Sequence, residues 1–205
     1  MKKNTYKGIL IAFDGPNGAG KTTLTGLVGE QLKSIGYEVY VTKEPTETEL
    51  GHYLRIFSET HNGYSLACLV MTDRYEHLDK EIIPALKDGK VVVTDRYILS
   101  SLILQMMDGV ESDFLMHINS EIIIPDLQVA VYANKTVLQE RLSNRTQLTR
   151  FERNNQSERE MFFMKKGVET LKEYGVPIQE INNNELNESV DQIVLSIEKL
   201  LKGYK

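Results

Sequence analysis

The chain has 205 residues, 41% of them hydrophobic and 26% charged, which is the composition of an ordinary globular protein long enough to bury a core. A formal net charge of −5 excludes a general attraction to polymeric nucleic acid or to anionic membranes, and the one cysteine, Cys68, excludes an internal disulfide and a zinc site made of cysteines. No apolar stretch approaches the roughly 18 residues of a membrane span, and the N-terminus is not typical of a signal peptide, so we expect one cytoplasmic domain over residues 1–205.

Strands and helices are expected to alternate along the chain. Apolar and β-branched runs predict five strands, at residues 9–13, 38–41, 91–94, 129–132 and 176–181. Helical spacing of apolar residues predicts helices at residues 22–35, 65–86, 158–174 and 190–201. Continuous apolar strands separated by helices are typical of a parallel sheet that helices cover on both faces, so the sequence predicts an α/β fold.

A phosphate-binding loop follows the first strand. Residues 15–22 read Gly-Pro-Asn-Gly-Ala-Gly-Lys-Thr, which matches G-x-x-x-x-G-K-[ST] in full. Glycines let successive N–H groups point at phosphate oxygens, and the N-terminus of the next helix adds a partial positive charge. Lys21 should reach the β- and γ-phosphates of ATP, and the Thr22 hydroxyl should bind Mg²⁺. The expected ATP-binding residues are Gly15, Asn17, Gly18, Ala19, Gly20, Lys21, Thr22, Thr23 and Arg141.

Residues elsewhere separate the classes of P-loop protein. A GTPase needs Asn-Lys-x-Asp to read guanine, whereas residues 134–137 read Asn-Lys-Thr-Val and lack the acid. The third strand runs into Asp95-Arg96-Tyr97. Asp95 can hold the water shell of Mg²⁺, and Arg96 places a forked cation beside it, so both are candidates for the reaction centre.

Arginines are concentrated in one segment. Five of the eight lie between residues 141 and 159: Arg141, Arg145, Arg150, Arg153 and Arg159. Phosphoryl transfer needs cations around the transferred group and exclusion of water, so this polar segment predicts a lid over about residues 143–157, with Arg150 as a catalytic residue. The alternative is a solvated helix surface on which the arginines pair with nearby glutamates, namely Glu140, Glu152, Glu158 and Glu160.

A nucleoside monophosphate suits this set of residues as acceptor. Its phosphate is largely dianionic near neutral pH, so it is already a nucleophile and needs no general base. The enzyme would then hold two anions together with cations. The sequence shows no obvious Ser–His or Cys–His pair, and its four histidines have no partner at metal-ligand spacing, so we take His52, His61, His77 and His117 as structural or surface residues.

With these motifs in order, the sequence resembles thymidylate kinases nearly end to end. Residues 43–45 resemble the family's Arg-Glu-Pro, residues 95–97 its Asp-Arg-Tyr/His signature, and residues 150–152 the Arg-Ile/Phe-Glu of its lid. Because no basic residue lies between Gly15 and Lys21, the loop matches the bacterial type, in which the lid supplies the catalytic arginine. The resemblance implies a five-stranded parallel sheet, ATP with Mg²⁺, transfer to dTMP, and a homodimer. It also implies an acceptor site of Glu44, Arg55, Val70, Arg74, Arg96, Ser100, Leu104 and Gln105.

The departures from the family pattern cluster at the acceptor site. Asn17 stands where an acid usually contacts the sugar, Val70 where an aromatic ring stacks on thymine, and Leu104 where a tyrosine lies against the sugar. Two alternatives therefore stay open. One is a related kinase for another monophosphate or for a deoxynucleoside, for which Glu44 would be the base. The other is an ATP-binding protein that transfers no phosphate.

Overall fold

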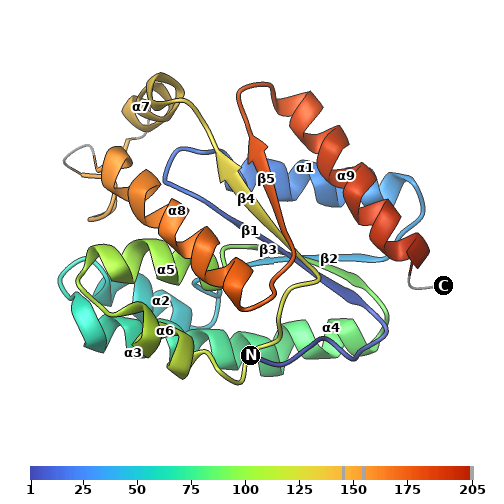
Figure 1. Ribbon diagram of the computed structural model, residues 1–205, viewed down its shortest axis with the longest axis horizontal. Coiled ribbons are helices and arrows are strands. Elements are labelled where there is room, and N and C mark those ends of the chain that lie inside the picture. Colours follow the sequence, from blue (N-terminus) through green and yellow to red (C-terminus); the bar gives the residue numbers. More distant parts are fainter. Residues whose placement is uncertain (145, 154–155, 204–205) are drawn as a thin grey trace.

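The computed structural model describes residues 1–144, 146–153 and 156–203 (Figure 1). Its centre is one parallel sheet of five strands in the order β2-β3-β1-β4-β5. The strands are β1 Ile9–Asp14, β2 Val39–Lys43, β3 Val91–Asp95, β4 Leu127–Tyr132 and β5 Ile178–Asn182. The predicted α/β fold is confirmed, and the strand boundaries differ from the predicted ones by at most two residues.

Helices cover both faces of the sheet (Figure 1). The helices are α1 Lys21–Ser34, α2 Glu49–Phe57, α3 Gly63–His77, α4 Ile83–Lys87, α5 Ile98–Met107, α6 Ser112–Ile118, α7 Lys135–Ser143, α8 Ser157–Glu173 and α9 Leu186–Gly203. Alternate residues of β1 divide between two cores: Leu10 and Ala12 pack with α3 to α6 and α8, whereas Ile9, Ile11 and Phe13 pack with α1 and α9. This division is why the strand is apolar at every position.

The long helix predicted at residues 65–86 contains an irregular turn. Between α3 and α4 lies a π-helical turn, η1, at Leu78–Ile82, so the helical segment runs from Gly63 to Lys87 with a change of hydrogen-bond pattern inside it. Helices α2, α5 and α6 were not predicted. Almost every residue of α5 is buried, so it lacks the one-sided apolar pattern that marks a surface helix.

The strand order places two loops at the site. The connection after β1 leads to β2 and the connection after its neighbour β3 leads to β4, so the two run in opposite directions along the sheet. Ligands of such sheets bind in the crevice outside the carboxyl ends of the strands at that point. The loop after β1 and the segment after β3 meet there, because the Arg96 N–H donates to Phe13 O over 2.8 Å. The phosphate-binding loop and the Asp95-Arg96 pair are therefore neighbours.

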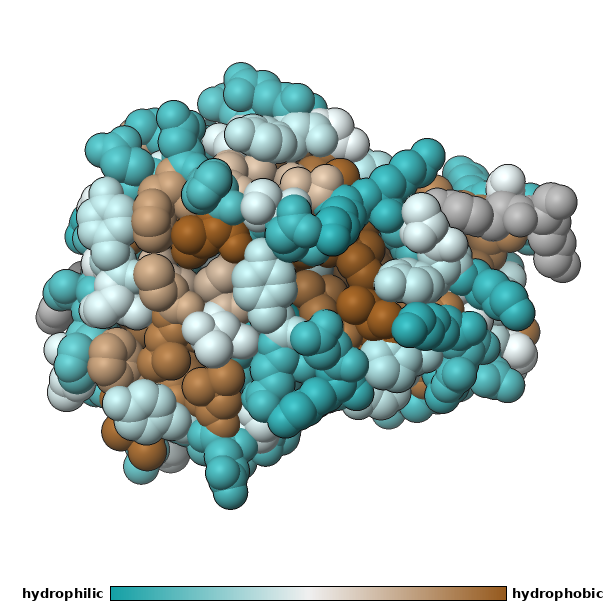
Figure 2. Space-filling view, turned by 90° about the horizontal axis from the view of Figure 1, so that it is seen from below, coloured by the Kyte–Doolittle hydropathy of each residue, from teal (hydrophilic) through white to brown (hydrophobic). Residues whose placement is uncertain are grey.

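The face seen from below in Figure 1, over α3, α4 and α6, carries many apolar side chains (Figure 2). Large apolar residues exposed on α2 and α3 are Tyr53, Ile56 and Tyr64, with 54%, 71% and 49% of their surface accessible. None of the described helices has the length and apolar character that a membrane span requires.

Candidate active site

The loop after β1 forms a cradle of backbone amides. Gly18 and Gly20 have φ values of +83° and +89°, in the left-handed region that side chains disfavour. The Ala19 carbonyl is held from outside the loop: Arg141 Nη1 donates to Ala19 O over 3.2 Å, and Asn183 Nδ2 donates to the same oxygen over 2.8 Å. With this carbonyl held away, and with the N-terminus of α1 at the end of the loop, the loop is suited to direct N–H groups at an anion.

Lys21, at the start of α1, is buried in this cradle. Its Nζ donates to Gly15 O over 3.0 Å and to Pro16 O over 2.9 Å. Burial lowers the pKa of Lys21 to about 7, and the nearby cation Arg96 acts in the same direction. An ammonium group whose partners among the described residues are neutral carbonyls is therefore placed where phosphate charge would stabilise it.

Asp95 and Thr22 provide two oxygen donors suited to Mg²⁺. Thr22 Oγ1 donates to Asp95 Oδ2 over 2.5 Å. Asp95 Oδ1 is buried and has no hydrogen-bond partner in the described part of the chain. A buried carboxylate oxygen left over in this way fits a hard cation, and Mg²⁺ commonly takes one or two protein oxygens beside phosphates and waters. Thr23, on the same turn of α1, is exposed.

Arg96 lies between the cradle and a neighbouring cavity. Its φ of +77° is in the left-handed region, which costs conformational energy in a residue other than glycine. Its guanidinium donates to Asn17 Oδ1 over 2.8 Å and to Ser100 Oγ over 3.2 Å. Asp14 is fully buried and anchors the second of these, because its Oδ1 accepts both the backbone N–H of Ser100 over 3.0 Å and the Ser100 hydroxyl. Asp14 is thus a structural residue that fixes the N-terminus of α5.

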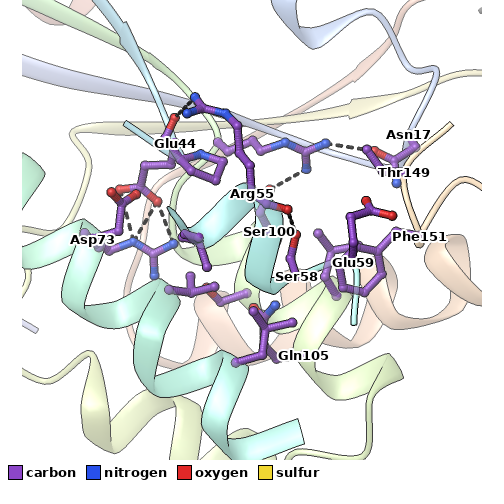
Figure 3. A pocket seen from close by; sticks show the side chains of 18 residues that line it. Asn17, Glu44, Arg55, Ser58, Glu59, Asp73, Ser100, Gln105, Thr149 and Phe151 are labelled. Carbon is purple, nitrogen blue, oxygen red and sulfur yellow. Dashed lines mark hydrogen bonds and ion pairs between the residues drawn. The ribbon is translucent and has the colours of Figure 1, made fainter. Parts of the chain in front are cut away.

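A cavity of about 340 Å³ adjoins the cradle at Asn17 and Arg96. Figure 3 shows its walls, with Asn17 and Thr149 on one side, Glu44 and Asp73 on the other, and Gln105 at the base. All eight residues predicted for the acceptor site line it: Glu44, Arg55, Val70, Arg74, Arg96, Ser100, Leu104 and Gln105. The volume and the apolar lower wall suit a small organic ligand.

Arg74 is held by the protein itself on one wall of the cavity. The side chain is 1% exposed. Its Nε and Nη2 donate to Glu44 Oε2 over 2.9 and 2.7 Å, and its Nη1 donates to Asn119 Oδ1 over 2.7 Å. Arg74, which was predicted for the acceptor site, is therefore one half of a buried ion pair in this structure.

His77 extends this ion pair to a second carboxylate. Its Nδ1 lies 3.3 Å from Glu44 Oε1, and its Nε2 lies 3.5 Å from Glu81 Oε2 and 2.8 Å from Thr42 Oγ1. Burial alone would lower the pKa of His77, but hydrogen bonds to the two glutamates outweigh it and raise the pKa to about 9. For Glu44, burial would raise the pKa of the carboxyl group, but the nearby Arg74 and His77 outweigh this effect, so its pKa is lowered. Glu44 is accordingly a poor general base.

Arg55 holds the loop between β2 and α2. Its Nη1 donates to Thr46 O over 2.7 Å and its Nη2 to Pro45 O over 2.5 Å. Thr46 is buried and donates through its hydroxyl to Asp73 Oδ1 over 2.6 Å. Thr46 thus fastens this cavity wall to α3.

Arg150 contacts the cavity rim and not the phosphate cradle. Its Nη1 and Nη2 donate to the two oxygens of Asp108 over 2.9 and 2.7 Å, and its Nε donates to Ser58 O over 2.9 Å. Arg153 pairs with Glu59 over 2.5 Å. These acids lie at the ends of α5 and α2, so the partners differ from the nearby glutamates that the sequence offered. The predicted lid also includes Arg145, which lies outside the described residues.

Several residues that line the cavity were not predicted to belong to the site, although some of them lie in the motifs that carry the resemblance. Phe151 lines the cavity, and the Arg150 guanidinium lies 4.1 Å from its ring centroid. Phe151 directly follows Arg150, so the sequence shows an aromatic residue here but does not show that its ring lines the cavity. Other such wall residues are Pro45, Leu54, Ser58, Glu59, Leu66, Asp73, Ser101 and Thr149.

Comparison with known proteins agrees with this architecture. The family model described as thymidylate kinase matches residues 13–193. A probable thymidylate kinase from Caldivirga maquilingensis is 32% identical over 202 residues, covering 95% of this chain and 96% of the relative. One from Pyrococcus horikoshii is 37% identical over 155 residues, covering 72% and 76%. The chain belongs to the thymidylate kinase family.

A solved structure shares the family fold. The crystal structure of thymidylate kinase from Ehrlichia chaffeensis superposes with a TM-score of 0.69 at 22% identity, covering 95% of this chain and 98% of that one. The resemblance to this family predicts that the cradle after β1 is the donor side of the site and that the cavity beside it is the acceptor side. The three positions that depart from the family pattern, Asn17, Val70 and Leu104, all line that cavity.

Proposed function

We propose that the chain transfers the γ-phosphoryl group of ATP to dTMP, giving ADP and dTDP. The observation that carries this proposal is the junction between the cradle and the cavity, where Arg96 and Asn17 belong to both, in a chain of the thymidylate kinase family. An acceptor phosphate at this junction would lie next to the phosphates of ATP. An oxygen of dTMP would attack the γ-phosphorus as the bond to the β–γ bridging oxygen breaks.

On the donor side, we assign the residues of the cradle to ATP. The backbone amides of residues 18–22 and the ammonium of Lys21 would bind the β- and γ-phosphates, whereas Pro16 has no N–H and the N–H of Asn17 is bound by Glu160. Arg141 would complete this side, since it already contacts the cradle. Thr22 and Asp95 would hold Mg²⁺, and the ion would supply positive charge to offset the negative charge that develops on the phosphates.

On the acceptor side, no general base is needed, because the monophosphate is largely dianionic at neutral pH. Arg96 and Arg55 would hold the phosphate, and Gln105 would read the base, with Val70, Leu104 and Phe151 as apolar surface around it. The engaged, low-pKa carboxylate of Glu44 argues against a deoxynucleoside acceptor, whose hydroxyl would have to be deprotonated.

The segment of about residues 143–157 is proposed as the lid, and Arg150 as a catalytic residue within it. To reach a transferred phosphoryl group, Arg150 would have to leave Asp108, to which it is bound through two hydrogen bonds. Because Ser58 lines the cavity and Asp108 ends α5, which supplies Ser100, Leu104 and Gln105 to its wall, the same contacts would hold the lid near an arriving acceptor. Closure of such a segment excludes water from the reaction.

The test is ADP release with ATP, Mg²⁺ and a panel of monophosphates and deoxynucleosides. We expect a strong preference for dTMP. Preference for another acceptor would mean that Asn17, Val70 and Leu104 define a different specificity. Binding of ATP without transfer to any member of the panel would contradict the proposal.

Assembly and location complete the proposal. We propose a homodimer in the cytoplasm, and the exposed Tyr53, Ile56 and Tyr64 on α2 and α3 support a contact between two copies. Sedimentation should give twice the 23.4 kDa mass of one chain. A monomer at micromolar concentration would contradict this part alone.

A further inference from the structure

We propose that Glu160 is a positioning residue that holds Arg96, through Asn17, at the junction of donor and acceptor sides. This inference rests on the proposed function. Glu160 lies in the first turn of α8, 143 residues from Asn17 in sequence, and belongs to no motif that relates the chain to its family. Its carboxylate is nevertheless buried, with 2% of its surface exposed.

Both oxygens of Glu160 are used on the same residue. Oε2 accepts the backbone N–H of Asn17 over 2.5 Å, and Oε1 accepts the side-chain Nδ2 over 2.9 Å. A buried carboxylate is costly unless it is fully hydrogen-bonded, so this pair of contacts is what allows Glu160 to be buried here. Two contacts to one residue also fix its backbone and its side chain together.

The carboxylate decides which way the Asn17 amide faces. An amide has a donor end and an acceptor end, whereas an ionised carboxylate only accepts. Glu160 therefore keeps Nδ2 on its own side and leaves Oδ1 toward Arg96, whose Nη2 donates to it over 2.8 Å. If the amide were flipped, the Asn17 NH₂ group would face the N–H groups of Arg96, and neither could accept a hydrogen bond from the other.

A matching arrangement lies on the other side of Arg96. The Ser100 hydroxyl donates to the buried carboxylate of Asp14, so its lone pairs face Arg96 Nη1 at 3.2 Å. Both neutral partners of Arg96 are thus oriented by a buried carboxylate: Asn17 by Glu160 and Ser100 by Asp14. Among the described residues, no carboxylate pairs directly with Arg96, in contrast to Arg74, which is bound directly by Glu44.

The test exchanges the amide and the acid. In Glu160→Gln, two amides face each other; in Asn17→Asp, two carboxylates do. In the double variant, the new amide at position 160 can donate to one oxygen of the new carboxylate at position 17 and accept the backbone N–H of that position. Arg96 can donate to the other carboxylate oxygen, so every hydrogen bond is restored. The matched control is Glu158→Gln in the same turn, where the side chain is 76% exposed and pairs with Lys135.

We expect each single variant to lower kcat for dTMP by about 10- to 100-fold, the effect of losing a buried hydrogen bond to a charged group, with the KM for ATP little changed. The double variant should recover to within about fivefold of the wild type, and Glu158→Gln should match the wild type. If Glu160→Gln does not fold, the comparison of Asn17→Asp with the double variant remains. A double variant no more active than the single variants would overturn the proposal. So would a loss of kcat in the single variants that is fully explained by a lower thermal unfolding midpoint.

A second readout separates this inference from the proposed function. The short bond to a carboxylate should shift the Asn17 amide proton downfield in the NMR spectrum, and Glu160→Gln should move it upfield together with the Arg96 side-chain N–H signals. If the wild type transfers phosphate to no nucleotide, the proposed function fails and the spectra still test the positioning. Unchanged Arg96 signals in Glu160→Gln would overturn it.

Discussion

The donor and acceptor sides of the site differ in how their charges are balanced. On the donor side, within the described ranges, Lys21 binds only neutral carbonyls and Asp95 keeps a buried oxygen without a partner. On the acceptor side, Arg74 is paired with Glu44 and Arg150 with Asp108. The donor side is therefore prepared for an ionic ligand, whereas the Arg74–Glu44 and Arg150–Asp108 pairs are complete without one.

Lys21→Ala breaks the donor side most directly. We expect transfer to fall by about 1,000-fold, because one buried cation opposite the transferred charge is lost. The thermal unfolding midpoint should stay the same or rise, since burial already disfavours the Lys21 charge. The measurement is ADP release together with thermal unfolding. Wild-type turnover would contradict the donor-side assignment.

Arg74→Met should show that the acceptor side is a scaffold. The substitution leaves Glu44 buried without its cation, and we expect a cost of about 3–5 kcal/mol in the free energy of unfolding. Affinity for dTMP should fall, with ATP affinity unchanged. Replacing both partners, as Arg74→Met with Glu44→Gln, should cost less than Arg74→Met alone. A change in ATP affinity alone would contradict the placement of Arg74 on the acceptor side.

The pH dependence of stability should report His77. Its folded-state pKa is raised from 6.5 to about 9, so its contribution is complete below pH 6.5 and is lost as pH rises through about 9. Chemical unfolding across this window should show the wild type losing roughly 3 kcal/mol relative to His77→Gln. His117→Gln, at an exposed site on α6, is the control. Parallel curves for the wild type and His77→Gln would contradict the buried cation.

Arg150→Ala tests whether Arg150, which pairs with Asp108 in this structure, acts on the phosphoryl group that ATP transfers. We expect kcat to fall by about 100-fold while ATP affinity changes little, because the side chain would act on the transition state. Arg153→Ala, which removes an exposed pair with Glu59, is the control. Equal losses in kcat and in ATP affinity would make Arg150 a ground-state contact.

Phe151→Leu should give the smallest effect. The residue lines the cavity whose aromatic surface is reduced by Val70, and a ring contact with a base contributes on the order of 1 kcal/mol. We expect the KM for dTMP to rise about fivefold and the KM for ATP to stay constant. An unchanged KM for dTMP would place the base away from this ring.

The same contrast explains what the sequence could and could not predict. The cradle lies in one continuous motif, so its residues and their neighbours Asp95 and Arg96 could be assigned from the sequence, as could the sheet. The acceptor residues could be named by resemblance, but their partners are distant in sequence: Arg74 binds Asn119, 45 residues away, and Arg150 binds Asp108, 42 residues away. Residue types alone do not say which acid meets which arginine, and Glu160 carried no local signal.

The π-helical turn η1 sets how helix α3 is rotated about its axis relative to helix α4, which follows it. Such a turn is equivalent to one residue inserted into an α-helix, so removing one residue from Leu78–Ile82 would rotate α3 by about 100° relative to α4. Helix α4 cannot follow, because Gly8 packs directly against the backbone of Leu86. The rotation would instead carry Arg74 and His77 away from Glu44. The acceptor wall is therefore more sensitive to a single deletion at this turn than to most substitutions on the surface of the same helix.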